Sequence, residues 1–231
     1  MSAARGWSWR RLLRLSPGCA AAVFAAGIVL AVLPKITNAE TPVDARDKAV
    51  FTALSAPLGQ AAARDRAEYD QRLAALNLDS LYSAEFVASD PDMARAKAKI
   101  AEARSLADLY RDRERQRRDE LTALIDTADV SQNFKNGARK ASRAPAASNR
   151  IWSALSAYYD SLDKAADILI DMRGRWRVTN GEMRFQEQAD IDRLERGYAA
   201  IDQAKAALDA VVLDMVGKRE DAVQYLGLPQ P

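Results

Sequence analysis

Histidine is absent from the 231 residues, and Cys19 is the only cysteine. A chain with one cysteine cannot form an internal disulfide, so a hydrophobic core has to stabilise its folded state. A chain without histidine lacks the commonest metal ligand and the commonest general base at neutral pH. These absences exclude zinc sites, Ser-His or Cys-His catalysis, and haem bound through histidine. The sequence predicts no metal and no cofactor.

Glycine and proline are scarce as well, with 10 and 8 residues in the whole chain. After residue 40 the commonest residue types are Ala, Arg, Asp and Leu, and this composition favours helix by intrinsic propensity. Residues 40–231 are numerous enough to bury the core of one domain. We therefore expect a single helical domain in this span.

Acidic residues are missing from the first 39 positions, which hold five basic residues and an apolar run over residues 18–33. This layout is typical of an export segment whose N-terminus stays in the cytoplasm. The length of the run lies between that of a signal-peptide core and that of a membrane-spanning helix. Two interpretations stay open: a signal peptide cleaved near Ala39, or an N-terminal anchor in the inner membrane. Cys19 lies at the start of the apolar run and not after it, which excludes a lipidated cysteine.

The basic balance of the chain belongs to this segment. The whole sequence has 34 basic and 32 acidic residues. Without the five basic residues of positions 1–39, 29 basic residues face 32 acidic ones, and the formal charge changes from +2 to −3. A weakly acidic domain gives no support to nucleic-acid binding.

Breakers and apolar spacing predict the first helices. Thr41-Pro42 has the form of a helix start, Pro57 is expected to interrupt the helix after Leu54, and a second stretch follows over residues 58–76. A short helical turn over residues 77–87 is expected to direct Leu78, Leu81, Tyr82 and Phe86 inward. A long helix is predicted from Ser89-Asp90-Pro91 to about Asp129, with one apolar face formed by Met93, Ala96, Ile100, Ala103, Leu106 and Tyr110.

Two parts of the middle of the chain are unusually charged. Nine of the ten residues from Arg111 to Glu120 are charged, and we expect a solvated stretch where the long helix extends beyond its neighbours. Residues 131–149 lack acidic side chains. This segment is interpreted either as a mobile connector or as a patch for an anionic lipid, glycan or protein partner, formed by Lys135, Arg139, Lys140, Arg143 and Arg150.

Two further helices carry the most regular patterns. In the first helix the apolar residues alternate spacings of four and three without a miss, as in the seam of a coiled coil, and the second helix repeats this pattern with one gap of seven, so helix-on-helix packing is predicted. The first helix contributes Ile151, Leu155, Tyr158, Leu162, Ala165, Leu169 and Met172. The second, over residues 189–216, contributes Ile191, Leu194, Tyr198, Ile201, Leu208, Val211 and Met215.

A β-hairpin is predicted between these helices, because Asn180-Gly181 lies between alternating apolar residues. With a two-residue turn, Trp176 faces Phe185 and Val178 faces Met183 on an apolar side that should lie on the helices. The same register sets Arg177 opposite Arg184, which is unfavourable without a compensating charge. Glu182, diagonal to Arg177, is one source of that charge, and an anionic ligand or an acidic partner is the other.

The predicted fold is all-α: an elongated antiparallel helical bundle with long amphipathic helices and one small β-hairpin at about residues 176–185. Residues 1–39 form the export signal or anchor, and residues 40–231 form a single helical periplasmic domain.

Two passages resemble a family of uncharacterised helical cell-envelope proteins of Gram-negative bacteria, many of them lipoproteins. The passages are residues 47–54, after the export segment, and the hairpin of residues 174–185, which leads into a helix at Asp190-Ile191. The resemblance implies an envelope location and a helical fold, and it implies no activity. Cys19 departs from the lipoprotein pattern of that family.

The function expected from the sequence is that of a non-enzymatic envelope module that binds a protein or an anionic envelope polymer. One alternative is a hydrolase that acts on glycan through paired carboxylates alone. Another is a helical bundle that binds a small ligand. The abundance of acidic residues on helix faces allows no catalytic pair to be chosen from the sequence.

Overall fold

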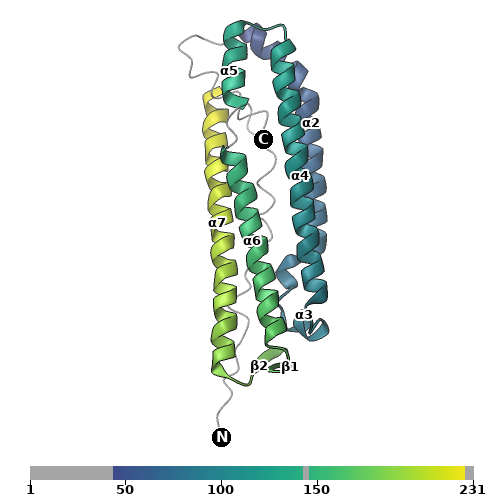
Figure 1. Cartoon of the computed structure of the whole chain (residues 1–231). Coiled ribbons are helices and arrows are strands. Elements are labelled where there is room, and N and C mark those ends of the chain that lie inside the picture. Colours follow the sequence, from purple (N-terminus) through teal and green to yellow (C-terminus); the bar gives the residue numbers. More distant parts are fainter. Residues whose placement is uncertain (1–43, 143–145, 227–231) are drawn as a thin grey trace. The chain divides into compact units, whose positions relative to one another are not determined.

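The computed structural model describes residues 44–142 and 146–226, with side chains described for residues 44–139 and 149–214 (Figure 1). The predicted export segment and Thr41-Pro42 lie outside this range. The described elements are α2 (Ala45–Leu76), the 3-10 turn η3 (Leu78–Ser80), α3 (Ala84–Ser89), α4 (Ala94–Thr127), α5 (Gln132–Ser142), α6 (Ala146–Asp171), β1 (Trp176–Thr179), β2 (Glu182–Phe185) and α7 (Gln188–Leu226). The prediction of an all-α bundle with one small hairpin is confirmed.

The described residues divide into two compact units. The hairpin unit contains residues 72–106 and 154–208, and the α5 unit contains residues 44–71, 107–142, 146–153 and 209–226. Helices α2, α4, α6 and α7 contribute residues to both units. None of the described helices is long and apolar enough to cross a membrane.

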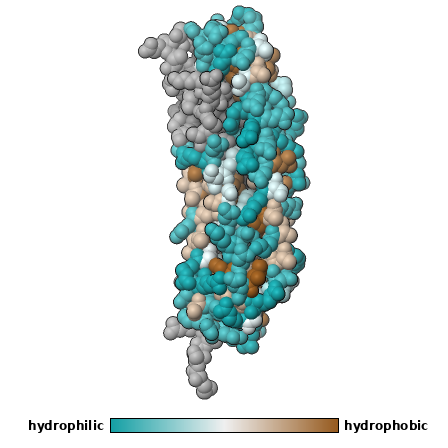
Figure 2. Space-filling model, viewed as in Figure 1, coloured by the Kyte–Doolittle hydropathy of each residue, from teal (hydrophilic) through white to brown (hydrophobic). Residues whose placement is uncertain are grey.

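Hydrophobic side chains in the described residues are mostly buried. Leu54, Leu109 and Leu213 are the large hydrophobic residues that stay exposed. The face drawn in Figure 2 is mainly hydrophilic, with hydrophobic residues in small separate patches. The fold is therefore stabilised by helix faces that pack against one another, as the amphipathic patterns predict.

Helix α4 confirms its predicted apolar face in full. The exposed fractions of Met93, Ala96, Ile100, Ala103, Leu106 and Tyr110 are all 2% or less. The helix begins at Ala94, later than the predicted start at Ser89-Asp90-Pro91. The Asp90 carboxylate accepts hydrogen bonds from the backbone N–H groups of Arg95 (3.3 Å) and Ala96 (3.0 Å), which would otherwise lack partners.

The expected break at Pro57 is wrong, because α2 continues through it. A proline inside a helix removes one backbone hydrogen bond and crowds the preceding turn, at a cost of about 3 kcal/mol. Packing on both sides of Pro57 offsets this cost. Phe51 belongs to a hydrophobic cluster of the α5 unit, and Leu58 packs against this cluster. The buried members of the cluster are Phe51, Leu121, Ile125, Phe134 and Ala138.

The same cluster shows that the expectation of a mobile connector is wrong for residues 132–142, which form α5. Phe134 is buried, and its ring centroid lies 5.2 Å from that of Phe51 in α2. The Ser131 N–H donates to the buried Asp47 carboxylate (3.0 Å), which holds the start of α5 to α2. The apolar spacing of Phe134 and Ala138 is thus that of a packed helix face.

In the hairpin unit, α6 packs on α4 and α7. Lys97 of α4 forms ion pairs with Asp163 and Asp167 of α6, and the hydrogen bond to Asp167 raises the pKa of Lys97. Arg104 reaches Asp160 of α6 at 2.8 Å. The predicted seam of α6 is buried except at Tyr158, which is half-buried, while Tyr159 is buried beside it.

In α7, the predicted residues Leu194, Tyr198, Ile201 and Leu208 are buried, whereas Ile191 and Val211 are half-buried. Met215 lies outside the residues with described side chains.

Between α2 and α4, Leu78, Leu81 and Tyr82 are buried as predicted, but Phe86 is half-buried. Val87 takes the buried position instead, and the guanidinium of Arg95 lies over the Phe86 ring, 5.1 Å from its centroid.

The hairpin has the predicted register residue by residue. Trp176 pairs with Phe185, Arg177 with Arg184, and Val178 with Met183. Asn180 and Gly181 both have positive φ, at 55° and 74°, as the predicted turn requires. Met183 is buried, and the indole N–H of Trp176 donates to the Leu169 carbonyl of α6 (3.2 Å), so the apolar side lies on the helices.

Candidate functional site

A groove with a volume of about 550 Å³ runs between α6 and α7 within the hairpin unit. It is open to solvent, and Lys164, Arg196 and Ala200 are exposed in it. From α6 it is lined by Ala157, Ser161, Lys164 and Ile168, and from α7 by Arg193, Arg196, Gly197, Ala200 and Ala204.

The lining residues repeat at helical spacing. On α6 they are four, three and four residues apart, and on α7 they also lie at spacings of three and four, with Arg196 and Gly197 adjacent in the sequence. Each helix therefore carries a second stripe beside its core face, made of small and basic side chains and, on α6, Ile168. This second stripe is a signal in the sequence for the groove, which was not among the predicted sites.

Gly197 sets the separation of the two helices at the floor of the groove. A Cβ atom at this position would lie 2.9 Å from Cδ1 of Ile168 on α6, closer than normal van der Waals contact. The absence of a side chain at Gly197 thus lets α7 approach α6 closely. Ser161 adds another small residue to the floor, and its hydroxyl donates to the Tyr158 carbonyl (2.7 Å).

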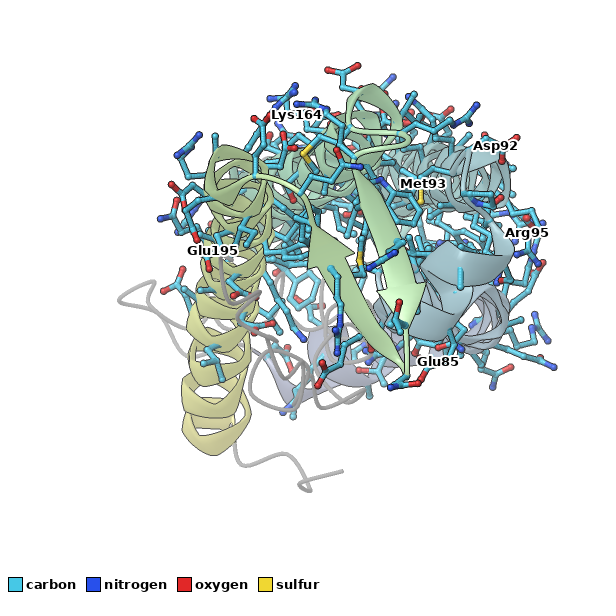
Figure 3. The ribbon with its side chains drawn as sticks, turned by 90° about the horizontal axis from the view of Figure 1, so that it is seen from below. Glu85, Asp92, Met93, Arg95, Lys164 and Glu195 are labelled. Carbon is cyan, nitrogen blue, oxygen red and sulfur yellow. The ribbon has the colours of Figure 1, made fainter. Side chains whose placement is uncertain are left out.

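Three cations line the groove, and they differ in their partners. Arg193 forms an ion pair with Asp171 at 2.7 Å. Lys164 and Arg196 have no ion-pair partner among the residues that the structure describes. Lys164 projects outward from α6 in Figure 3. One cation from each helix is therefore available to an anionic ligand.

The predicted anion contacts on the hairpin also belong to this unit. Arg177 is exposed, whereas Arg184 is half-buried and its Nε atom is buried without a hydrogen bond among the described residues. Glu182 lies 4.0 Å from Arg184 on the same strand. Figure 3 shows Glu85 of α3 near the hairpin turn, where its Oε1 would lie 3.9 Å from a Cβ atom on Gly181.

The predicted basic patch of residues 135–150 belongs to the α5 unit, and its described members are paired with acidic or carbonyl groups. Lys135 donates to the Asp126 carbonyl (3.0 Å), and Arg139 donates to the Asp126 carboxylate (2.7 Å). Arg150 reaches Asp214 of α7 at 3.1 Å. The side chains of Lys140 and Arg143 lie outside the described residues. The described cations of this segment therefore connect helices of the fold.

The prediction of a solvated stretch at residues 111–120 is confirmed only in part. Arg111, Asp112, Arg115, Gln116, Asp119 and Glu120 are exposed, but three charged residues connect helices of the α5 unit. Arg113 binds Asp65 (2.8 Å) and Glu68 (3.0 Å) of α2, and Arg117, which is buried, also binds Asp65. Burial lowers the pKa of Arg117. Glu114 accepts a hydrogen bond from the indole N–H of Trp152 in α6 (2.9 Å).

Acidic side chains are numerous, but the described residues contain no group of three that could hold a metal ion. Buried carboxylates serve local structure instead. Asp190 in the first turn of α7 binds Arg175 at 2.7 Å and so ties the hairpin to that helix. The groove between α6 and α7 brings cations, small residues and a concave surface together in the hairpin unit.

Comparison of the chain with models of protein families, with curated proteins and with solved structures finds no match. The resemblance to helical envelope proteins therefore stays a prediction, and the function has to be inferred from the residues of the chain and their geometry.

Proposed function

We propose that the protein is a non-enzymatic helical module of the cell envelope that binds another macromolecule through the groove between α6 and α7. One observation carries the proposal: Lys164 and Arg196 flank this groove without ion-pair partners among the described residues. Some other lysine and arginine side chains connect helices, as Lys97 and Arg113 do. Cations without such a structural partner are available for recognition.

The envelope location is part of the proposal and rests on residues 1–39. Their basic residues and apolar run are typical of export, so residues 40–231 would function in the periplasm. The module would be soluble after cleavage near Ala39, or attached to the inner membrane through an uncleaved segment. In either case its partners are other components of the envelope.

Photocrosslinking in cells tests this function. A photoreactive amino acid at Ala200, which is exposed in the groove, is expected to give a covalent adduct with an envelope macromolecule. The matched control carries the same amino acid at Ala101, an exposed position of α4 outside the groove. The proposal fails if Ala200 gives no more adduct than Ala101.

A second candidate function is the binding of a small anionic ligand, because 550 Å³ lies within the size range of ligand pockets. The exposure of the groove favours a macromolecule, since small-molecule sites enclose most of the ligand surface. Native mass spectrometry of protein purified from cells distinguishes the two. A bound small anion, lost in Lys164→Glu, would support the second candidate.

A further inference from the structure

The two ends of the groove differ in chemistry. Arg193 lies beside Asp171, and Gly197 lies beside Ile168, so α6 and α7 are antiparallel here and residue numbers rise on one helix as they fall on the other. Arg193 and Arg196 therefore lie at the end near the hairpin. Ala157 and Ala204 lie at the other end, where the lining is uncharged.

We propose that the groove binds an acidic amphipathic helix of a partner protein. That helix would present small or aliphatic side chains to the floor and carboxylates to Lys164 and Arg196. The inference rests on the proposed function and names the class of partner.

The shape of the groove fits a helix. Its α6 stripe runs from Ala157 to Ile168, which is about three helical turns or 16 Å at 1.5 Å per residue. Ser161, Gly197 and Ala200 project little from the floor, so a third helix could reach the usual interaxial distance of about 8–10 Å. The stripes of small residues at spacings of three and four would receive the ridges of that helix.

The charges fit acidic side chains on that helix. Lys164 comes from α6 and Arg196 from α7, so a helix lying between them would have a cation on each side. Carboxylates at positions i and i+4 lie on one face of a helix. Carboxylates at neighbouring positions lie on either side of that face. Each carboxylate could form a charge-assisted hydrogen bond with the cation on its side.

Other occupants fit less well. A second copy that used the same groove would place its own Lys164, Arg193 and Arg196 against these cations, which is repulsive. A uniformly anionic polymer would leave the floor at Ala157 and Ala204 without an apolar partner. An amphipathic helix matches both the charged rim and the apolar floor.

The test extends the crosslinking experiment with the full chain in cells. The Ala200 adduct is isolated, and the crosslinked segment of the partner is identified by mass spectrometry. We expect a helical segment with carboxylates on both sides of an apolar stripe. The yield of the Ala200 adduct should fall about tenfold or more in the Lys164→Glu/Arg196→Glu variant, since two attractive charge pairs become repulsive. Arg64→Glu/Arg173→Glu is the matched control, because both residues are exposed outside the groove and the charge change is equal.

Reversal of charge on the partner completes the test. Replacing the partner carboxylates by lysine should restore the adduct of the Lys164→Glu/Arg196→Glu variant, which a general loss of folding could not do. An adduct with a lipid, a glycan or a second copy of the chain would overturn the inference while leaving binding at the groove intact. An adduct with a protein helix that is insensitive to the Lys164→Glu/Arg196→Glu change would also overturn it. Absence of any adduct would instead reject the proposed function.

Discussion

Trp176 and Arg177 are neighbours in β1 whose side chains leave opposite faces of the ribbon. Trp176 is half-buried and hydrogen-bonded to Leu169, whereas Arg177 is exposed. We expect Trp176→Ala to lower the free energy of unfolding by about 2 kcal/mol, because it removes apolar contacts and one hydrogen bond. Arg177→Ala should change it by less than about 0.5 kcal/mol.

Urea denaturation of both variants, followed by circular dichroism, measures this difference. Similar losses for the two variants would contradict the packing of the apolar side on α6. A small gain for Arg177→Ala would be consistent with relief of its repulsion from Arg184 across the ribbon.

Asp70 of α2 is predicted to have an unusual pH dependence. Burial raises the pKa of Asp70 above 3.8, despite its ion pair with Arg66. A carboxyl group whose pKa is raised by folding stabilises the fold fully only below its unfolded pKa, and this contribution is lost as the pH rises through the folded pKa. Asp70→Asn has no such titration. Its stability relative to the unmodified protein should therefore increase between about pH 3 and pH 6.

Urea unfolding at several pH values gives this difference directly, and the titration of all other carboxyl groups cancels in the comparison. A relative stability that fell over the same range would mean that attraction to Arg66 outweighs burial. The sign of the slope is the decisive observation.

Helices α2 and α4 are joined in the α5 unit by a partly buried ionic network, and its members are not equivalent. The side chain of Arg117 is 11% exposed and that of Asp65 is 19% exposed. Arg117→Met should change stability by no more than about 1 kcal/mol, because Asp65 keeps Arg113 and a buried guanidinium is replaced by an apolar chain. Asp65→Leu should lower stability by roughly 3 kcal/mol, because it leaves Arg117 buried without its carboxylate.

The measurement is again the free energy of unfolding in urea, with Arg111→Met as the control. Arg111 lies on the same helix and its side chain is 46% exposed, so its replacement should have little effect. A larger loss of stability for Arg117→Met than for Asp65→Leu would contradict this prediction. It would mean that the ion pair of Arg117 stabilises the fold by more than its burial costs.

The elements that were predicted correctly are those whose structure follows from the hydrophobic pattern of the sequence alone. The faces of α4 and α6 and the register of the hairpin were predicted because periodicity alone determines which side is apolar. Pro57 and α5 were predicted wrongly, since the outcome depended on packing against Phe51, a residue distant in sequence from Phe134. Local signals for a break or a connector cannot include that contact.

At the scale of the whole molecule, export is a prediction that rests on residues 1–39, which lie outside the described residues. A reporter that is active only outside the cytoplasm, fused after Pro231, is expected to be active, because the basic segment before the apolar run resists translocation. An inactive fusion, with the protein intact in the cells, would overturn the predicted topology. The mass of the mature protein then distinguishes cleavage after Ala39 from a retained anchor.

The sequence by itself determined the all-α class, the buried faces of the long helices and the hairpin turn. Each of these follows from short-range periodicity or from the φ angles that Asn180 and Gly181 must adopt. Tertiary structure alone decided which charges are available. Arg113 and Arg117 are paired with Asp65, whereas Lys164 and Arg196 flank a groove without such partners among the described residues. A charged side chain looks the same in a sequence in either case, because its partner is set by how the helices pack and not by its neighbours along the chain.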